Sequence, residues 1–269
     1  MRSVVVAVLV ACSAPNKRPA PAPPPPTQPA TLGETRTLDS RILGETRTIN
    51  VYLPPDYTKG DARYPVLYMP DGGMDEDFPH VVGSVDVSIK NALIRPVIVV
   101  GVKNTVRKRD LVGPTKLEEE KQLIPEAGGS ERFRRFLRDE LKPMIEARYR
   151  TTKESALIGE SAAGLFVIET FLVEPALFDA YIAADPSVWW NEQELVRGAH
   201  PRLAWWTAGP KKLYFATAEM QEGIEILATA LRIQAPAGLA WVHDPMPHET
   251  HGTIFPAAAL RGIRWVFVR

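Results

Sequence analysis

The chain has 269 residues, 45% of them hydrophobic, which is enough for one well-buried domain. Lys plus Arg and Asp plus Glu number 32 each, so the formal net charge is zero. A neutral chain has no overall attraction to nucleic acid or to an anionic membrane surface, so we expect no nucleic-acid partner and no electrostatic binding to a membrane.

The first twelve residues resemble a bacterial export signal. Arg2 precedes the apolar run 4–10, and the run ends in Leu9-Val10-Ala11-Cys12, which is similar to a lipobox, where the cysteine is lipidated after cleavage. Cys12 is the only cysteine, so it has no partner for an internal disulfide. We therefore expect an exported protein, periplasmic or on the outer surface, with a lipid anchor at Cys12.

Residues 13–31 are dominated by proline and alanine. Such a segment buries little apolar area and favours extended polyproline conformations, so it is interpreted as a linker. A linker after a lipidated cysteine would hold the following domain away from a surface. The predicted organisation is thus a signal and lipobox (1–12), a linker (13–31) and a folded domain (32–269).

The domain opens with a short repeat, because Leu-Gly-Glu-Thr-Arg-Thr occurs at residues 32–37 and again at 43–48. Each copy is followed by residues that alternate between apolar and polar, which predicts two antiparallel strands joined near Leu43-Gly44. Pro54-Pro55 ends the second strand, since proline donates no hydrogen bond to a sheet.

Apolar runs then alternate with segments of helical periodicity. This alternation is typical of βαβ units, so we predict an α/β fold with a mostly parallel, doubly wound sheet and an N-terminal antiparallel hairpin. Gly128-Gly129-Ser130 is expected to break the chain and cap the first long helix. The predicted strands are 64–69, 96–102, 156–159, 180–184, 213–216 and 239–243, and the predicted helices are 130–149, 164–173, 223–233 and 257–268.

The most informative segment is the strand–turn–helix around Ser161. Small residues flank this serine, as required where a tight turn lifts a nucleophilic hydroxyl above the sheet. Gly159 occupies the first glycine position of the G-x-S-x-G motif, but Ala163 replaces the second. The motif therefore departs from its strict form, and a plain strand-to-helix turn is an equally good interpretation when the segment is taken alone.

Chain order favours the catalytic interpretation. In α/β-hydrolases the serine precedes an acid and then a histidine, each after a later strand. We predict His251 as the base, in preference to His248, because Gly252 allows close approach of the backbone to the site. Glu219 is the preferred acid, with Glu222 as the substitute, and a structural role at a helix N-terminus is the alternative for both.

The oxyanion hole is expected to use the backbone N–H of Ala162 and one from the loop 70–74. That loop contains Gly72-Gly73, whose glycines let the main chain turn its amides toward a substrate. The alternative for these glycines is an ordinary turn.

Together the motifs resemble the "putative esterase" family of α/β-hydrolases, which includes siderophore esterases of the enterobactin type, S-formylglutathione hydrolases, feruloyl esterases and mycolyltransferases. The resemblance implies Ser161 as nucleophile, His251 as base, and Gly73 and Ala162 as oxyanion donors. Glu219 would stand where the family usually has Asp, and some members of the branch manage with a Ser–His dyad. The resemblance is carried by residues 43–54, 64–68, 71–72, 159–161, 185–190 and 251–256.

The predicted function is hydrolysis of a small-molecule carboxylic ester through an acyl-enzyme. The alternatives are acyl transfer by the same Ser and His, and a surface-tethered binding protein without catalysis. Arg107, Arg109, Trp189 and Trp190 are candidate substrate contacts, although loop arginines and packing tryptophans are commoner than ligand contacts. No His, Asp and Cys cluster has metal-ligand spacing, so neither a metal nor another cofactor is expected.

Overall fold

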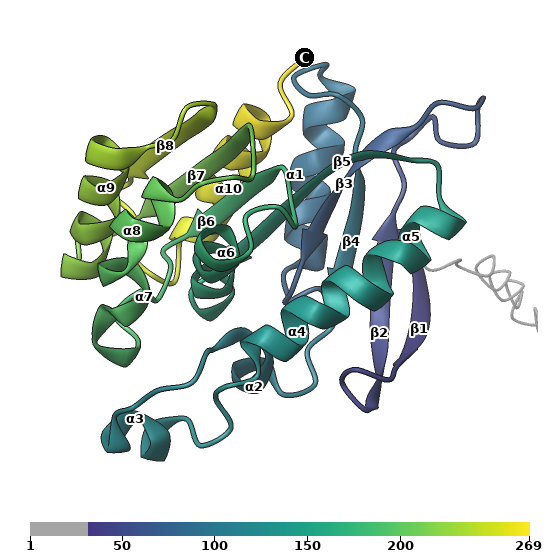
Figure 1. The fold of residues 1–269 in the computed structure, drawn as a ribbon. Coiled ribbons are helices and arrows are strands. Elements are labelled where there is room, and N and C mark those ends of the chain that lie inside the picture. Colours follow the sequence, from purple (N-terminus) through teal and green to yellow (C-terminus); the bar gives the residue numbers. More distant parts are fainter. Residues whose placement is uncertain (1–31) are drawn as a thin grey trace, which may run out of the picture. The chain divides into compact units, whose positions relative to one another are not determined.

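The computed structural model describes residues 32–269, which form one compact unit. The expected signal segment, Cys12 and the linker 13–31 lie outside the described residues. Helices cover both faces of a single twisted sheet (Figure 1). Within residues 32–269 no helix is long and apolar enough to cross a bilayer.

The sheet has eight strands in the order β1-β2-β4-β3-β5-β6-β7-β8. β1 and β2 form the predicted antiparallel hairpin, β2 is antiparallel to β4, and all other neighbours are parallel. The α/β fold with its N-terminal hairpin is thereby confirmed. The strands are β1 (Glu34–Ser40), β2 (Glu45–Tyr52), β3 (Tyr64–Met69), β4 (Ile98–Val102), β5 (Thr151–Glu160), β6 (Ala180–Ala184), β7 (Lys211–Thr217) and β8 (Leu239–Pro245).

The helices divide between the two faces of the sheet. α1 and α10 pack on one face, and α4, α6 and α9 contribute to the apolar cluster on the other. The helices are α1 (Phe78–Lys90), α2 (Arg107–Leu111), α3 (Glu118–Leu123), α4 (Ser130–Phe136), η1 (Leu137–Leu141), α5 (Lys142–Arg148), α6 (Ala162–Val173), η2 (Asn191–Gln193), α7 (Glu194–Arg197), α8 (Ala199–Ala204), α9 (Glu222–Gln234) and α10 (Ile254–Val266).

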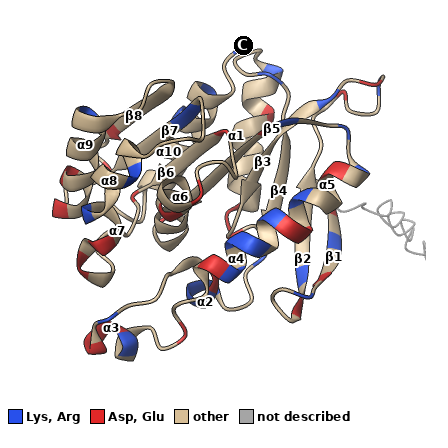
Figure 2. Cartoon of the chain, viewed as in Figure 1, with Lys and Arg blue, Asp and Glu red and all other residues tan. Residues whose placement is uncertain are grey.

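Burial on both faces explains why the central strands are continuous apolar runs. Leu157 of β5 belongs to one apolar cluster and its neighbour Ile158 to the other. β3, β4 and β6 contain no charged residue, whereas charges of both signs are spread over the helices (Figure 2). The core therefore fixes the sheet and leaves the loops at the strand ends available for chemistry.

The structure differs from the predicted elements in several places, including the short helices η2, α7 and α8, which were not predicted. α1 was not predicted, although its buried Val81, Val82 and Val85 follow helical spacing after Pro79 in the first turn. The segment between β4 and α4, predicted as a loop, contains the short helices α2 and α3. Ser130 is not a cap: Gly129 holds that position, and the Ser130 hydroxyl donates to Glu169 Oε1 at 2.9 Å.

Candidate active site

Ser161 lies between the end of β5 and the first residue of α6. Its φ of 58° and ψ of −116° are a strained conformation for a residue with a side chain. The neighbouring hydrogen bonds hold it there: its N–H donates to the carbonyl of Ala184 at 3.0 Å, and its own carbonyl accepts the N–H groups of Leu165 and Ser187. This is the geometry of a nucleophile elbow.

Gly159 and Ala163 approach closely on either side of the elbow. A Cβ added to Gly159 would lie 2.7 Å from the backbone and the methyl group of Ala163. The turn therefore requires glycine before the serine, whereas the fully buried methyl group of Ala163 fits after it. The departure from the strict motif is accommodated because only one of the two positions lacks room for a side chain.

His251 faces the serine from the loop between β8 and α10. Its Nε2 lies 3.0 Å from Ser161 Oγ, within hydrogen-bond reach for a general base. Thr253 supports the loop, because its hydroxyl accepts the N–H of Thr250 at 2.9 Å and donates to Glu249 at 2.6 Å. The structure thus brings together the two residues that the sequence pairs, whereas His248 is exposed.

The carboxylate beside the histidine is Asp185, and not the predicted Glu219. Asp185 Oδ2 lies 2.6 Å from His251 Nδ1, and Oδ1 accepts the N–H of Ala218 at 3.0 Å. The side chain is buried, while the histidine side chain is 58% exposed. Asp185 directly follows β6, which neighbours β5 in the sheet, so its carboxylate emerges next to the elbow.

The two glutamates considered from the sequence lie elsewhere. Glu219 is exposed in the wall of the cavity beside Ser161, and none of its hydrogen bonds within the described residues reaches His251. Glu222 accepts from Gln193 at 3.1 Å and pairs with Arg197 at 3.4 Å. Both follow β7, one strand further from β5 than Asp185.

The two expected oxyanion donors differ in their availability. The Ala162 amide lies in the first turn of α6, where N–H groups have no partner within the helix. Gly73, by contrast, donates its N–H to Glu76 Oε2 at 2.7 Å. Glu76 also accepts from the Asn104 side chain at 3.0 Å, so this carboxylate is held in place over the Gly73 amide.

A cavity of about 340 Å³ opens beside the serine, which is large enough for a small ester. Trp189, 44% exposed, forms part of its wall. Trp190 does not line this cavity: it is buried, and its indole N–H donates to the Gly113 carbonyl at 3.0 Å. The lining residues are Ser161, Asp185, Pro186, Ser187, Trp189, Ala218, Glu219, Gln221 and His251.

Arg107 lies close to the elbow but is engaged by a carboxylate. Its Nε and Nη2 bind the buried Asp71 at 2.6 and 2.8 Å, and Nη2 reaches the Glu160 carbonyl at 3.4 Å. It therefore ties the loop after β3 to the strand that carries the nucleophile.

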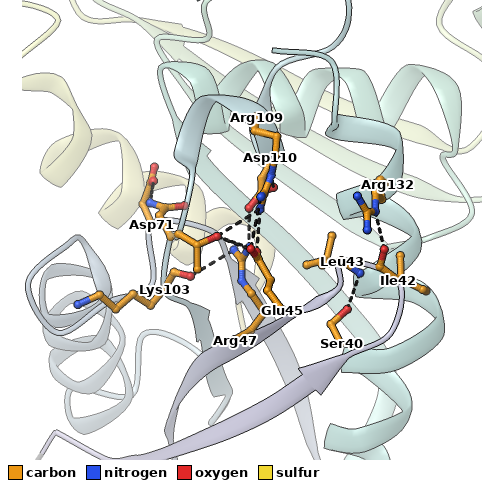
Figure 3. Close-up of polar contacts among 12 residues, drawn as sticks. Ser40, Ile42, Leu43, Glu45, Arg47, Asp71, Lys103, Arg109, Asp110 and Arg132 are labelled. Carbon is orange, nitrogen blue, oxygen red and sulfur yellow. Dashed lines mark hydrogen bonds and ion pairs between the residues drawn. The ribbon is translucent and has the colours of Figure 1, made fainter. Parts of the chain in front are cut away.

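Arg109 belongs to a charged cluster that is separate from the catalytic residues. It binds Asp110 Oδ1 and Glu45 Oε1, both at 2.7 Å, while Arg47 binds Asp110 Oδ2 at 2.6 Å (Figure 3). Arg47 and Asp110 are almost completely buried. The cluster joins the N-terminal hairpin to α2, so the arrangement explains Arg109 as a structural residue.

Two carboxylates near the elbow have raised pKa values. The pKa of Glu160 rises to about 7, chiefly because burial removes the carboxylate from water and because Asp77 is nearby, although His251 and Arg107 lower it. Burial and the charge of Asp71 raise the pKa of Asp77. Among residues 32–269 no group of His, Cys, Asp and Glu could hold a metal ion.

Known proteins similar to this chain include siderophore esterases and a serine hydrolase. The chain is 32% identical over 185 residues to the ferri-bacillibactin esterase BesA of Bacillus subtilis, a match that covers 61% of each protein. An IroE-like serine hydrolase from Shewanella oneidensis superposes with a TM-score of 0.78 at 29% identity, covering 87% of this chain and 79% of that one. The siderophore hydrolase EstB from Aspergillus nidulans shares the fold, with a TM-score of 0.72 at 21% identity over 91% and 97%.

The family assignment comes from residues 40–229, which match the family described as "Putative esterase". The matched region includes Ser161 and Asp185, while His251 lies beyond it. The match covers about three fifths of the length of BesA, so the activity of BesA is not assigned to this chain. Because the family match covers well over half of the sequence, the chain belongs to the "Putative esterase" family.

Proposed function

We propose that this protein is a serine esterase that hydrolyses a carboxylic ester through an acyl-enzyme on Ser161. The observation that carries the proposal is the continuous hydrogen-bonded series from Ser161 Oγ through the His251 ring to Asp185. A serine hydroxyl is a poor nucleophile until a base accepts its proton, and the carboxylate orients that base and stabilises its cation.

The distances support a two-stage reaction. His251 Nε2 accepts the Ser161 proton as Oγ attacks the ester carbonyl carbon, and the imidazolium then protonates the departing alcohol. In the second stage Nε2 takes a proton from water, the hydroxide attacks the acyl carbon, and Ser161 leaves with the proton. His251 is more than half exposed, so water has direct access to the acyl-enzyme.

The Ala162 amide is the donor best suited to the developing oxyanion, since it lies at the N-terminus of α6 beside Ser161. Gly73 would serve as the second donor only by exchanging the Glu76 carboxylate for the substrate oxygen.

Hydrolysis of p-nitrophenyl butyrate tests the proposal. Ser161→Ala is expected to lower kcat by at least about 1,000-fold while the protein stays folded, because the nucleophile is lost. Ser84→Ala on α1, remote from the elbow, is the matched control and keeps the wild-type rate. Equal turnover by the Ser161→Ala variant and the wild type would rule out Ser161 as the nucleophile.

The names of the relatives suggest siderophore esters as one class of substrate to test. A panel of a siderophore lactone, a feruloyl ester and short acyl esters, measured with the domain 32–269, ranks these classes by kcat/KM.

We also propose that the protein is exported and lipid-anchored through Cys12, on the strength of the lipobox-like segment and the Pro/Ala-rich spacer alone. In a bacterial host, the full chain is expected to partition into detergent and to incorporate labelled palmitate, and Cys12→Ser to abolish both. Equal labelling of the two proteins would contradict a lipid at Cys12.

A further inference from the structure

Acidic and aromatic side chains surround the catalytic serine. The residues that line the cavity beside Ser161 include Asp185 and Glu219, but neither lysine nor arginine. Glu219 is exposed, and no cation among the described residues pairs with it. This wall of the site therefore presents negative charge and the exposed indole of Trp189 to a substrate.

Carboxylates also dominate the opposite side of the serine. Glu160 directly precedes the nucleophile and has no ion-pair partner within residues 32–269, while the Asp77 carboxylate pairs there only with His80, at 3.4 Å. Arg107 reaches the carbonyl of Glu160, but Asp71 already holds two of its nitrogens. The charges on this side therefore sum to a negative value as well.

Of the other cations on this segment, Lys103 is also compensated, whereas Lys108 is exposed. Lys103 binds both oxygens of Asp75, at 2.8 and 3.0 Å, and its side chain is exposed. The chain as a whole is neutral, so the negative charge at the site reflects where the residues lie and not the composition. Burial is the main cause of the raised pKa values of Glu160 and Asp77, and neighbouring carboxylates add to it.

We infer that the site selects esters by charge: it favours substrates with a cationic group near the ester bond, accepts neutral ones and discriminates against anionic ones. The inference rests on the proposed esterase function and specifies its substrate class. Uncompensated carboxylates attract a cation and repel an anion through a poorly screened cavity. The Trp189 ring, beside Glu219, provides a face on which an ammonium group binds favourably.

Three butyrate esters of similar size test this inference: butyrylcholine, 3,3-dimethylbutyl butyrate and 2-sulfoethyl butyrate. Each kcat/KM, measured by pH-stat, is divided by the rate constant of hydroxide hydrolysis of the same ester, which removes differences in intrinsic reactivity. At about 20 mM salt we expect the cationic ester to exceed the anionic one by at least tenfold, with the neutral ester between them. At about 500 mM salt the ratio is expected to shrink, because salt screens the charges.

Glu219→Gln identifies the contribution of the cavity wall. This variant removes one negative charge while keeping side-chain size, so the ratio of cationic to anionic kcat/KM is expected to fall at least threefold. Glu222→Gln is the matched control: Glu222 pairs with Gln193 and Arg197 outside the cavity, so the ratio is expected to stay at its wild-type value.

The outcomes separate this inference from the proposed function. Hydrolysis of all three esters at equal normalised rates, or faster hydrolysis of the anionic ester, would overturn charge selection and leave the esterase proposal intact. Failure to hydrolyse the neutral ester, together with failure of a fluorophosphonate to label Ser161, would overturn the esterase proposal itself.

Discussion

Asp185 is the carboxylate that orients His251, and the order of residues along the sequence did not identify it. It adopts a φ of 39°, its N–H donates to the Ala216 carbonyl, and its two carboxylate oxygens bind the Ala218 amide and His251. Such a conformation in a residue other than glycine is costly, and it persists here because these contacts fix it. The conformation aims the carboxylate at the histidine.

Asp185→Asn is expected to lower kcat for p-nitrophenyl butyrate by at least about 100-fold, because the amide does not stabilise the imidazolium formed when His251 takes the serine proton. Thermal unfolding is expected to change by only a few degrees, since the amide oxygen still accepts the Ala218 N–H. Glu219→Gln is expected to keep more than a tenth of the rate. If the Glu219 variant lost more activity than the Asp185 variant, the orienting acid would be Glu219.

Gly159→Ala tests the close approach at the elbow. The added methyl group would lie 2.7 Å from Ala163, so we expect a loss of about 1–3 kcal/mol in the free energy of unfolding, measured by urea denaturation. Gly83→Ala, where the added Cβ has nothing within 4 Å on α1, is the control and is expected to stabilise by about 0.5–1 kcal/mol. Equal effects at the two positions would show that the elbow has room for a side chain.

Glu160 makes stability depend on pH. Its pKa rises from 4.5 to about 7 in the folded protein, so the native state holds this proton more tightly than the unfolded state. The resulting stability is fully present below pH 4.5 and is lost as the pH rises through 7. The side chain is only half-buried, so solvent screening reduces the effect to about 1 kcal/mol.

Urea denaturation of Glu160→Gln checks this dependence. The variant cannot ionise, so relative to the wild type it is expected to gain about 1 kcal/mol between pH 5 and pH 8. A difference between the two proteins that is the same at both pH values would contradict the raised pKa.

At the scale of elements, the strands were the most predictable feature. The runs 64–69 and 180–184 coincide with β3 and β6, because strands buried on both faces are apolar at every position. α1 was missed because its helical spacing follows a loop rich in Asp and Gly. The structure of the segment between β4 and α4 was even harder to predict. Its short helices are stabilised by tertiary contacts, such as the salt bridge between Arg109 and Glu45.

The buried cluster of Arg47, Asp110, Glu45 and Arg109 joins the hairpin β1–β2 to α2 (Figure 3). Arg47 also stacks on Phe133, with its guanidinium carbon 5.3 Å from the ring centroid. In the sequence, Arg47 belongs to a predicted strand and Arg109 to a predicted loop. Only the fold shows that both arginines bind the same two carboxylates, Glu45 and Asp110. Partners distant in sequence cannot be paired from composition or spacing.

Asp110→Asn is expected to cost about 3 kcal/mol in the free energy of unfolding, because the buried Arg47 loses its buried carboxylate and keeps only the partly exposed Glu45. The control is Asp75→Asn, which breaks the exposed pair with Lys103 and is expected to change stability by less than about 1 kcal/mol. Urea denaturation measures both. Similar small losses in the two variants would show that the buried cluster does not hold the hairpin to α2.

At the scale of the whole molecule, chain order carried more information than any single motif. The succession of strand, serine and later histidine predicted that Ser161 and His251 would meet at one edge of a parallel sheet, and the structure places them 3.0 Å apart. The acid was predicted one strand too far along, because the sheet allows a carboxylate after either β6 or β7 to point toward the site. The net charge of the chain gave no information about the site. The whole chain is neutral, yet the cavity beside Ser161 is lined by carboxylates and by no lysine or arginine.

The central claim is that His251 and Asp185 activate Ser161 as a nucleophile. Intact-mass and peptide-mapping measurements after brief exposure to a fluorophosphonate test it most directly, because the probe reacts with an activated serine and hardly with an ordinary one. We predict a single adduct on Ser161 in the wild type and at least about 100-fold slower labelling of His251→Ala. An unlabelled Ser161 in folded protein, or equal labelling rates in the two proteins, would contradict the account.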